Sequence, residues 1–198
     1  MYPFLQSRYW VFDLDGTLTR PVHDFEYIRR ELGMESGADI LATIESRDAA
    51  TRFRLHQKLD HLEMFYARQA APAKGVIDLL AQLTRSGCRL GIVTRNKKDF
   101  AISSLQAIKA WEFFDETVII GRDEAAPKPH PQGIGLLLKQ WQAAGEEAVM
   151  VGDFRYDLEV GRAVGAATIH VDDRLERSWP ELTDLKVESL QELCALIG

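Results

Sequence analysis

Short apolar runs, each closed by a polar or turn-forming residue, recur along this sequence of 198 residues. The first run covers residues 9–12 and is followed by Asp13 and Gly16. Four more runs of the same form lie at residues 90–93, 118–120, 149–151 and 168–171. Runs of this length that end at turn residues are typical of strands buried on both faces, as in a parallel sheet.

The segments between the runs carry apolar residues at helical spacing. Val76, Leu79, Leu80 and Leu83 fall at positions i, i+3, i+4 and i+7 of one such pattern. Further patterns occupy residues 102–108, 134–141, 158–164 and 189–197. Strands that alternate with single helices are joined by right-handed crossovers and form a parallel sheet with helices on both faces. We therefore predict an α/β fold with a doubly wound, Rossmann-like parallel sheet.

One long segment, from about residue 23 to residue 71, has helical patterns but no convincing strand. Its three predicted helices lie near residues 27–32, 40–44 and 48–69. Because this segment interrupts the alternation after the first strand, we predict a small helical domain, residues 20–72, inserted into an α/β core. The core is then formed by residues 1–19 and 73–198.

Ligands of a doubly wound sheet bind at the carboxyl ends of its strands, so the residues that follow each strand are candidates for a functional site. These candidates are Asp13, Asp15, Gly16 and Thr17 after the first strand, Thr94, Arg95 and Asn96 after the second, Lys128 after the third, and Gly152, Asp153 and Asp157 after the fourth. The topology predicts that all of them meet at one edge of the sheet.

The aspartates of this edge suit a metal ion. In an extended segment Asp13 and Asp15 point the same way, which is costly unless a cation or a shared proton offsets the two like charges. Asp153 and Asp157, taken alone, could be a helix N-cap and a first-turn residue. Together with Asp13 they supply hard oxygen ligands, and we therefore predict a Mg²⁺ site.

A hydroxyl group and a lysine accompany the aspartates. Thr94 in isolation would simply end a strand, and Lys128 in isolation would be a solvated loop residue. Pro127 and Pro129 restrict the loop on both sides of Lys128 and favour a directed side chain. A phosphoryl group needs a metal ion, a cationic partner and small hydrogen-bond donors around its oxygens, and this edge supplies all three.

These groups of residues, taken in order, resemble the four motifs of the haloacid dehalogenase superfamily. They are residues 12–19 (Phe-Asp-Leu-Asp-Gly-Thr-Leu-Thr), residues 93–96 (Val-Thr-Arg-Asn), Lys128-Pro129, and Gly152-Asp153 with Asp157. Their order and spacing cover nearly the whole chain. The helical insertion is similar to the cap domain that many members carry after the first motif. Within the superfamily the chain most resembles phosphoglycolate-phosphatase-like members.

The resemblance implies a Mg²⁺-dependent phosphatase that hydrolyses a small phosphomonoester metabolite through a covalent phosphoaspartate. Asp13 would be the nucleophile, and Asp15 would protonate the leaving oxygen and then activate water. Thr94 would donate to a phosphoryl oxygen, and Lys128 would balance the charge of the nucleophile and the phosphate. The substrate-binding candidates are Thr94, Arg95, Asn96 and Lys128.

The same resemblance implies how the metal ion is held. Asp13, Asp153 and the backbone carbonyl of Asp15 would bind Mg²⁺ directly. Asp157 would act through a water molecule or support the other ligands.

Asp15 narrows the range of reactions that the resemblance allows, because dehalogenase members of the superfamily lack an acid at that position and transport ATPases carry threonine there. A phosphomutase of the β-phosphoglucomutase type is the alternative to a phosphatase, and a requirement for a sugar bisphosphate would mark it. A phosphate-binding module without turnover is a third hypothesis. The intact pair Asp13 and Asp15 argues against that module, since a binder has no use for a nucleophile and an acid.

Composition limits the expected partners. The net charge is −6 and Lys and Arg form no long run, so the chain has no electrostatic footprint for a nucleic acid. No apolar run is long enough to cross a bilayer, and we identify no signal-peptide pattern. Cys88 and Cys194 lie far apart, which favours two buried thiols in a reducing compartment, so we expect a cytoplasmic protein. The sequence does not set an oligomeric state.

Overall fold

A parallel sheet of six strands forms the centre of the computed structural model, which describes residues 2–22, 24–173 and 177–197. The strands are β1 (Tyr9–Phe12), β2 (Arg89–Val93), β3 (Ile119–Ile120), β4 (Ala148–Gly152), β5 (Ala167–Val171) and β6 (Leu185–Val187). Their order across the sheet is β3-β2-β1-β4-β5-β6, and every neighbouring pair is parallel. The predicted doubly wound sheet is confirmed.

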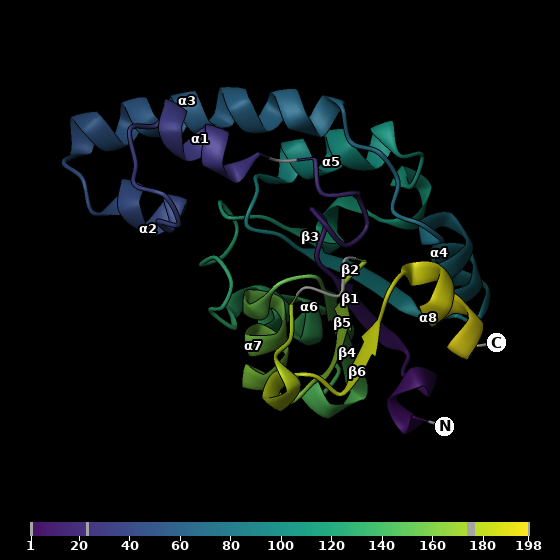
Figure 1. The fold of residues 1–198 in the computed structure, drawn as a ribbon. Helices are drawn as coiled ribbons and strands as arrows, with labels where there is room; N and C mark the ends of the chain where they lie inside the picture. The colour runs from purple at the N-terminus through teal and green to yellow at the C-terminus, as the bar shows by residue number, and fades with distance from the viewer. Residues whose placement is uncertain (1, 23, 174–176, 198) are drawn as a thin grey trace.

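Helices cover both faces of this sheet (Figure 1). Apolar residues of α4 (Val76–Arg85), α5 (Lys98–Ala107) and α8 (Leu190–Ile197) join the buried cluster on one face. Those of α6 (Gln132–Trp141) and α7 (Arg155–Ala163) join the cluster on the other face. Short 3-10 helices lie at Pro3–Gln6, Trp111–Phe113, Glu116–Val118, Gly145–Glu147 and Pro180–Leu182. No helix in the described ranges is both long enough and apolar enough to cross a membrane.

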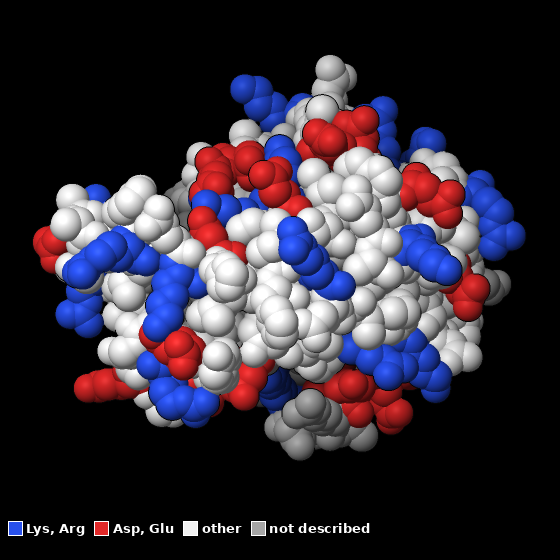
Figure 2. Space-filling model, turned by 90° about the horizontal axis from the view of Figure 1, so that it is seen from above, with Lys and Arg blue, Asp and Glu red and all other residues white. Residues whose placement is uncertain are grey.

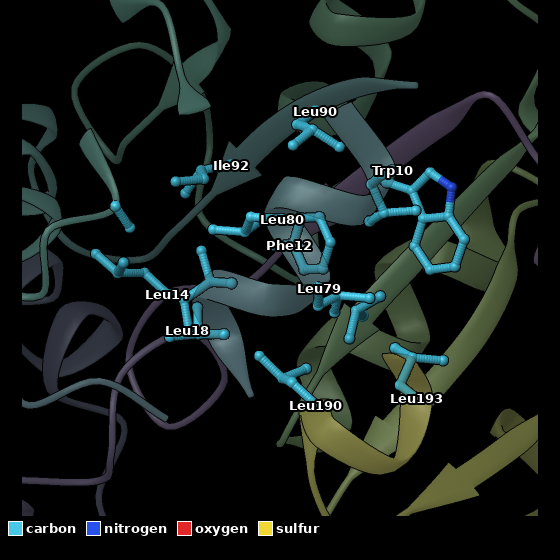
Figure 3. Packing of buried hydrophobic residues seen from close by; sticks show 14 of the residues in the cluster. Trp10, Phe12, Leu14, Leu18, Leu79, Leu80, Leu90, Ile92, Leu190 and Leu193 are labelled. Atoms are coloured by element: carbon cyan, nitrogen blue, oxygen red, sulfur yellow. The ribbon is translucent and has the colours of Figure 1, made fainter. Parts of the chain in front are cut away.

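The central strand β1 contributes to both clusters. Trp10 and Phe12 point to one face and Val11 to the other, because side chains alternate along a strand. All three side chains are fully buried. Trp10 and Phe12 lie among leucines of α4 and α8, including Leu80 and Leu193 (Figure 3). A strand covered on both faces needs apolar residues at every position, which explains the unbroken run at residues 9–12.

Three helices between β1 and α4 lie outside these layers (Figure 1). They are α1 (Phe25–Glu31), α2 (Ile40–Glu45) and α3 (Ala49–Arg68), as the sequence predicts. Each follows an aspartate whose carboxylate accepts a hydrogen bond from a backbone N–H group three residues later. These capping residues are Asp24, Asp39 and Asp48.

The three helices, which we call the cap together with the loops that join them, pack on one another. Ile28 of α1, Ile44 of α2 and Leu59 of α3 are buried in one cluster that is separate from the two clusters of the sheet. The chain leaves and rejoins the core through neighbouring segments, residues 18–20 and 71–73, which are joined by backbone hydrogen bonds of 2.8 and 3.0 Å. The division into domains at residues 20 and 72 stays a prediction.

Two strands differ from the sequence pattern. Val118 ends a 3-10 helix, so β3 contains only Ile119 and Ile120. The sequence pattern does not predict β6, because one lysine between two apolar residues is too short a segment to show a period.

Leu80→Ala tests the packing of α4 on the sheet. Leu80 is fully buried, so the substitution leaves a cavity and should lower the free energy of unfolding by about 3 kcal/mol. Urea unfolding followed by circular dichroism measures this loss. Leu136→Ala is the matched control, because Leu136 lies on α6 and is exposed. Equal losses for the two variants would contradict the described packing.

Candidate active site

The site lies where the connections of the sheet change direction. From β1 the chain continues to β2 and β3 on one side, and it then crosses to β4 on the other side of β1. The carboxyl ends of β1 and β4 therefore flank a crevice, as expected at a topological switch point. A pocket of about 950 Å³ lies here, lined by residues of the sheet edge and of the cap.

All eight residues that the sequence predicts for the site line this pocket. They are Asp13, Asp15, Thr94, Arg95, Asn96, Lys128, Asp153 and Asp157. The fold thus brings together four segments that are far apart in the sequence. The chemical role of each residue stays a prediction.

Asp13 directly follows β1 and is fixed by its neighbours. Its N–H group donates to the carbonyl of Val151 in β4 at 2.9 Å, which extends the sheet pairing by one residue. Asp13 is only 7% exposed. Its Oδ1 lies 2.5 Å from Nζ of Lys128, and its Oδ2 accepts a hydrogen bond from the Thr17 hydroxyl at 3.2 Å. The carboxylate is therefore held in one orientation with a cation beside it.

Lys128 is buried between two carboxylates. Its Nζ lies 2.5 Å from Asp13 and 2.6 Å from Asp157. Burial alone would lower the pKa of Lys128, but the two carboxylates outweigh burial and raise the pKa above its ordinary value. The lysine therefore stays charged at neutral pH. Its peptide bond to Pro129 is cis.

Asp13, Asp153 and Asp157 form a cluster of negative charge. One carboxylate oxygen from each lies within 4.8 Å of the others. Burial raises the pKa of Asp157 to about 6, against the opposing effect of Lys128. Burial and the charges of the other two aspartates also raise the pKa of Asp153. Like charges buried this close together favour a bound cation, and their hard oxygens fit Mg²⁺.

Asp15 is half-buried in the loop after β1 and lines the same pocket. Proton transfer is the role predicted for its side chain, and metal binding is the role predicted for its backbone carbonyl. Both stay predictions.

Two glycines let the carboxylates approach the backbone. A Cβ atom on Gly16 would lie 2.7 Å from Oδ2 of Asp153, and the φ angle of Gly16 is +98°, which side chains rarely adopt. A Cβ atom on Gly152 would overlap the side chain of Asp157. Glycine is therefore needed at both positions, because any side chain would displace a candidate metal ligand.

Arg177 contacts the cluster from the segment after β5, and the sequence pattern does not identify it. Its guanidinium lies 3.2 Å from Oδ2 of Asp153 and over the ring of Phe154, 5.2 Å from the ring centre. The backbone N–H group of Arg177 donates a hydrogen bond to the carboxylate of Asp172 at 3.0 Å. No motif surrounds Arg177 in the sequence, so only the folded chain shows that it lies beside Asp153.

Thr94 and Asn96 organise the loop after β2. Thr94 is buried, and its Oγ1 accepts a hydrogen bond from the N–H group of Asn96 at 3.0 Å. The Asn96 side chain accepts from the N–H group of Lys97 at 2.9 Å. Within the described ranges no acceptor takes the Thr94 hydroxyl proton. This proton can therefore be donated to an oxygen in the pocket.

Arg95, the residue between them, pairs with the cap. Its guanidinium contacts both carboxylate oxygens of Asp39 at 2.7 and 2.8 Å, and it donates to the carbonyl of Lys128 at 3.0 Å. It also lies over the ring of Tyr156, 4.7 Å from the ring centre. Its predicted substrate contact stays a prediction, but the side chain already joins the cap to the core.

A second group of ion pairs joins α3 to the core. The side chain of Arg122 is only 5% exposed and lies 2.8 Å from Asp60 and 2.7 Å from Glu63. Lys97 lies 2.6 Å from Asp60. The sequence analysis does not single out these residues. Arg122 lies two residues after β3, close to the end of its apolar run, which is a usable signal. No local pattern relates Asp60 or Glu63 to the site.

Figure 2 shows the molecule from above, the side on which α3 lies in Figure 1. Acidic and basic side chains are mixed over this face, and no continuous basic strip crosses the part that is described. The absence of a nucleic acid partner is expected from such a surface and from the net charge of −6, and it stays a prediction.

A doubly wound sheet with aspartates, a threonine and a lysine at its switch point is the arrangement of an enzyme that acts on an anionic group. Residues 10–171 match the family described as haloacid dehalogenase-like hydrolase. The chain therefore belongs to this family, and the expected class of enzyme, a hydrolase, is confirmed.

Known proteins resemble the chain over nearly its whole length. It is 29% identical to an uncharacterized hydrolase of Saccharomyces cerevisiae, covering 94% of this chain and 89% of that protein. It is 26% identical to the pyrophosphatase PpaX of Bacillus pumilus, covering 95% of each. A solved structure described as a predicted phosphoglycolate phosphatase from Haemophilus somnus matches with a TM-score of 0.76 and 15% identity, covering 98% of this chain and 99% of that one. At that identity the match shows a shared fold.

Gly16→Ala tests the geometry of the acidic cluster. The new Cβ atom would push against Asp153, so we expect at least a tenfold loss of affinity for Mg²⁺ (roughly the effect of disturbing ligand orientation), measured by isothermal titration calorimetry. Gly33→Ala is the control, because Gly33 also has a positive φ angle, +68°, but no atom lies within 4 Å of its added Cβ. Its affinity for Mg²⁺ should stay unchanged. An unchanged affinity in Gly16→Ala would contradict the proposed ligand set.

Proposed function

We propose that this protein is a phosphatase that hydrolyses a small phosphomonoester through a phosphoaspartate on Asp13. The observation that carries this proposal is the buried carboxylate of Asp13 with Nζ of Lys128 at 2.5 Å, at the base of a pocket shared with Asp15 and Thr94. Membership of a hydrolase family and the similarity to a pyrophosphatase support the same chemistry.

In the first step a carboxylate oxygen of Asp13 attacks phosphorus, and the bond between phosphorus and the ester oxygen breaks. Asp15 gives its proton to the leaving oxygen, so the alcohol departs neutral. Lys128 offsets negative charge on the nucleophile and the phosphoryl group, and the Thr94 hydroxyl donates to a phosphoryl oxygen. The product on the enzyme is an acyl phosphate.

In the second step a water molecule attacks the phosphorus of the acyl phosphate. Asp15, now ionised, takes a proton from this water. The bond between phosphorus and the Asp13 oxygen breaks, which releases inorganic phosphate and restores both aspartates to their starting states.

Asp13 and Asp153 would hold the divalent cation that this family generally uses, with the backbone carbonyl of Asp15 as a further ligand, and Asp157 would act through a water molecule or support the other ligands. The cation supplies positive charge that offsets the repulsion between the carboxylate and the phosphoryl oxygens. Mg²⁺ is the ion that an all-oxygen ligand set of this kind favours.

Removal of the metal ion tests this requirement. Hydrolysis of p-nitrophenyl phosphate should fall to background after complete chelation with EDTA, because Lys128 and Arg177 do not offset both the clustered aspartates and a phosphoryl group. Addition of Mg²⁺ in excess over EDTA should restore the rate, which shows that chelation did not unfold the protein. Undiminished turnover after chelation would contradict the proposal.

The variants Asp13→Asn and Asp15→Asn distinguish the roles proposed for the two aspartates. Asp13→Asn should abolish turnover of every ester, because an amide cannot form the acyl phosphate. Asp15→Asn should slow the hydrolysis of alkyl phosphates by about 10²- to 10⁴-fold, since the leaving oxygen loses its proton donor. Nitrophenolate leaves well without a proton, so its first step should survive better, and the phosphoenzyme should accumulate.

Intact-protein mass spectrometry after acid quench measures this accumulation. A phosphate adduct on Asp15→Asn that maps to Asp13 is the expected result. Full activity in that variant with no adduct at any time would overturn the scheme.

A further inference from the structure

The cap wall of the pocket is rich in negative charge. Among the described residues between 20 and 72 that line the pocket, four are acidic and two are basic. The acidic residues are Asp24, Glu26, Asp39 and Glu63, and the basic residues are Arg20 and Arg29.

Of these two cations, Arg29 is already paired. The Arg29 guanidinium lies 2.6 Å from Glu26 and donates to the carbonyl of Ala38 at 2.8 Å. On the core side, Arg95 is bound by Asp39. These two guanidinium groups are therefore occupied within the protein, and a second anionic group of a substrate would have to displace a carboxylate to reach them.

Glu63 lines the same pocket as Asp15. Its side chain is 14% exposed and extends from α3 into this pocket. Burial raises the pKa of Glu63 to about 7 against the effect of Arg122, and the charge of Asp15 adds to the rise, so Glu63 is fully charged only above neutral pH. Since Asp15 protonates the leaving oxygen, the alcohol part of the substrate lies in the pocket that Glu63 lines.

We propose that Glu63 is a specificity-determining residue that selects substrates whose alcohol part carries hydroxyl groups and rejects those with a second anionic group near the ester oxygen. This inference rests on the proposed function, because it takes Asp15 as the proton donor. A hydroxyl group can donate a hydrogen bond to Glu63. A carboxylate or phosphate at the same place would be desolvated against Asp15 and Glu63, where like charges repel.

Besides Lys128, three further cations of the pocket are exposed. Arg20 and Lys74 lie on the segments that lead into and out of the cap, and Arg177 pairs with Asp153. Charges in contact with solvent are screened, so they offset the acidic wall only weakly.

Two esters of similar size test the selection. 2-Hydroxyethyl phosphate has a neutral hydroxyl group, and 2-phosphoglycolate has a carboxylate, in the same region of the alcohol part. At about pH 8.5, where Glu63 is ionised, the wild type should hydrolyse 2-hydroxyethyl phosphate with a kcat/KM at least about tenfold higher, the order of effect of one like charge at a partly buried site. A wild type that prefers 2-phosphoglycolate, or that does not discriminate, would overturn the inference.

Glu63→Gln shows whether this residue causes the preference. Glutamine keeps the size and an acceptor oxygen but carries no charge, so the ratio of the two kcat/KM values should fall by about tenfold toward unity. Asp60→Asn is the matched control, because Asp60 also pairs with Arg122 but does not line the pocket. An unchanged ratio in Glu63→Gln, or an equal change in Asp60→Asn, would contradict a direct role of Glu63.

Binding separates this inference from the proposed function. Asp13→Asn binds esters without turning them over, and isothermal titration calorimetry gives its affinity for each of the two esters. A preference for 2-hydroxyethyl phosphate that Glu63→Gln removes in this background would support the inference even if the wild type hydrolysed neither ester. Binding of neither ester, or equal binding of both, would overturn it.

Discussion

The rest of the site depends on Lys128. A buried ammonium group loses its hydration, and only well-placed partners offset that cost. Asp13 and Asp157 supply this compensation at 2.5 and 2.6 Å. Asp13 follows β1 and Asp157 lies in the first turn of α7, so one cation fixes the two segments that carry the aspartates of the site. Removal of any member of this trio would leave a buried charge without its partner, which is costly in any fold.

Ion pairs between oppositely charged side chains also hold the cap on the core. The core contributes Arg95, Lys97 and Arg122, and the cap contributes Asp39, Asp60 and Glu63. Arg122 is nearly buried, so added salt screens its pairs less than it screens exposed pairs. The acidic residues that bind the cap to the core are in part the same residues that line the pocket. The docking of the cap and the charge of the substrate site are therefore set together.

The sequence predicts the sheet and the acidic edge because both depend on local signals. Apolar runs of strand length and the polar residues after them identify β1, β2, β4 and β5, and parallel topology then brings their ends together. Three cap helices are also predicted, since apolar spacing is a local feature.

The remaining features depend on contacts between distant segments, and the sequence pattern does not contain them. Strand β6 exists because it pairs with β5, and its three residues are too few to show a period. Arg177 lies beside Asp153 and over the ring of Phe154 only in the folded chain, because these residues are far apart in the sequence. The position of Glu63 near Asp15 follows from how α3 lies on the core, which no periodicity encodes.

The cap begins and ends at adjacent points of the core, residues 18–20 and 71–73, which are joined by hydrogen bonds. The entropic cost of closing an inserted loop rises only slowly with its length. An insertion whose ends are adjacent can therefore vary in length and sequence at little cost to the sheet. Asp13, Lys128, Asp153 and Asp157 all lie outside this stretch. Mutations within this one continuous segment can therefore change which substrate the enzyme accepts, while the residues of the acidic cluster stay the same.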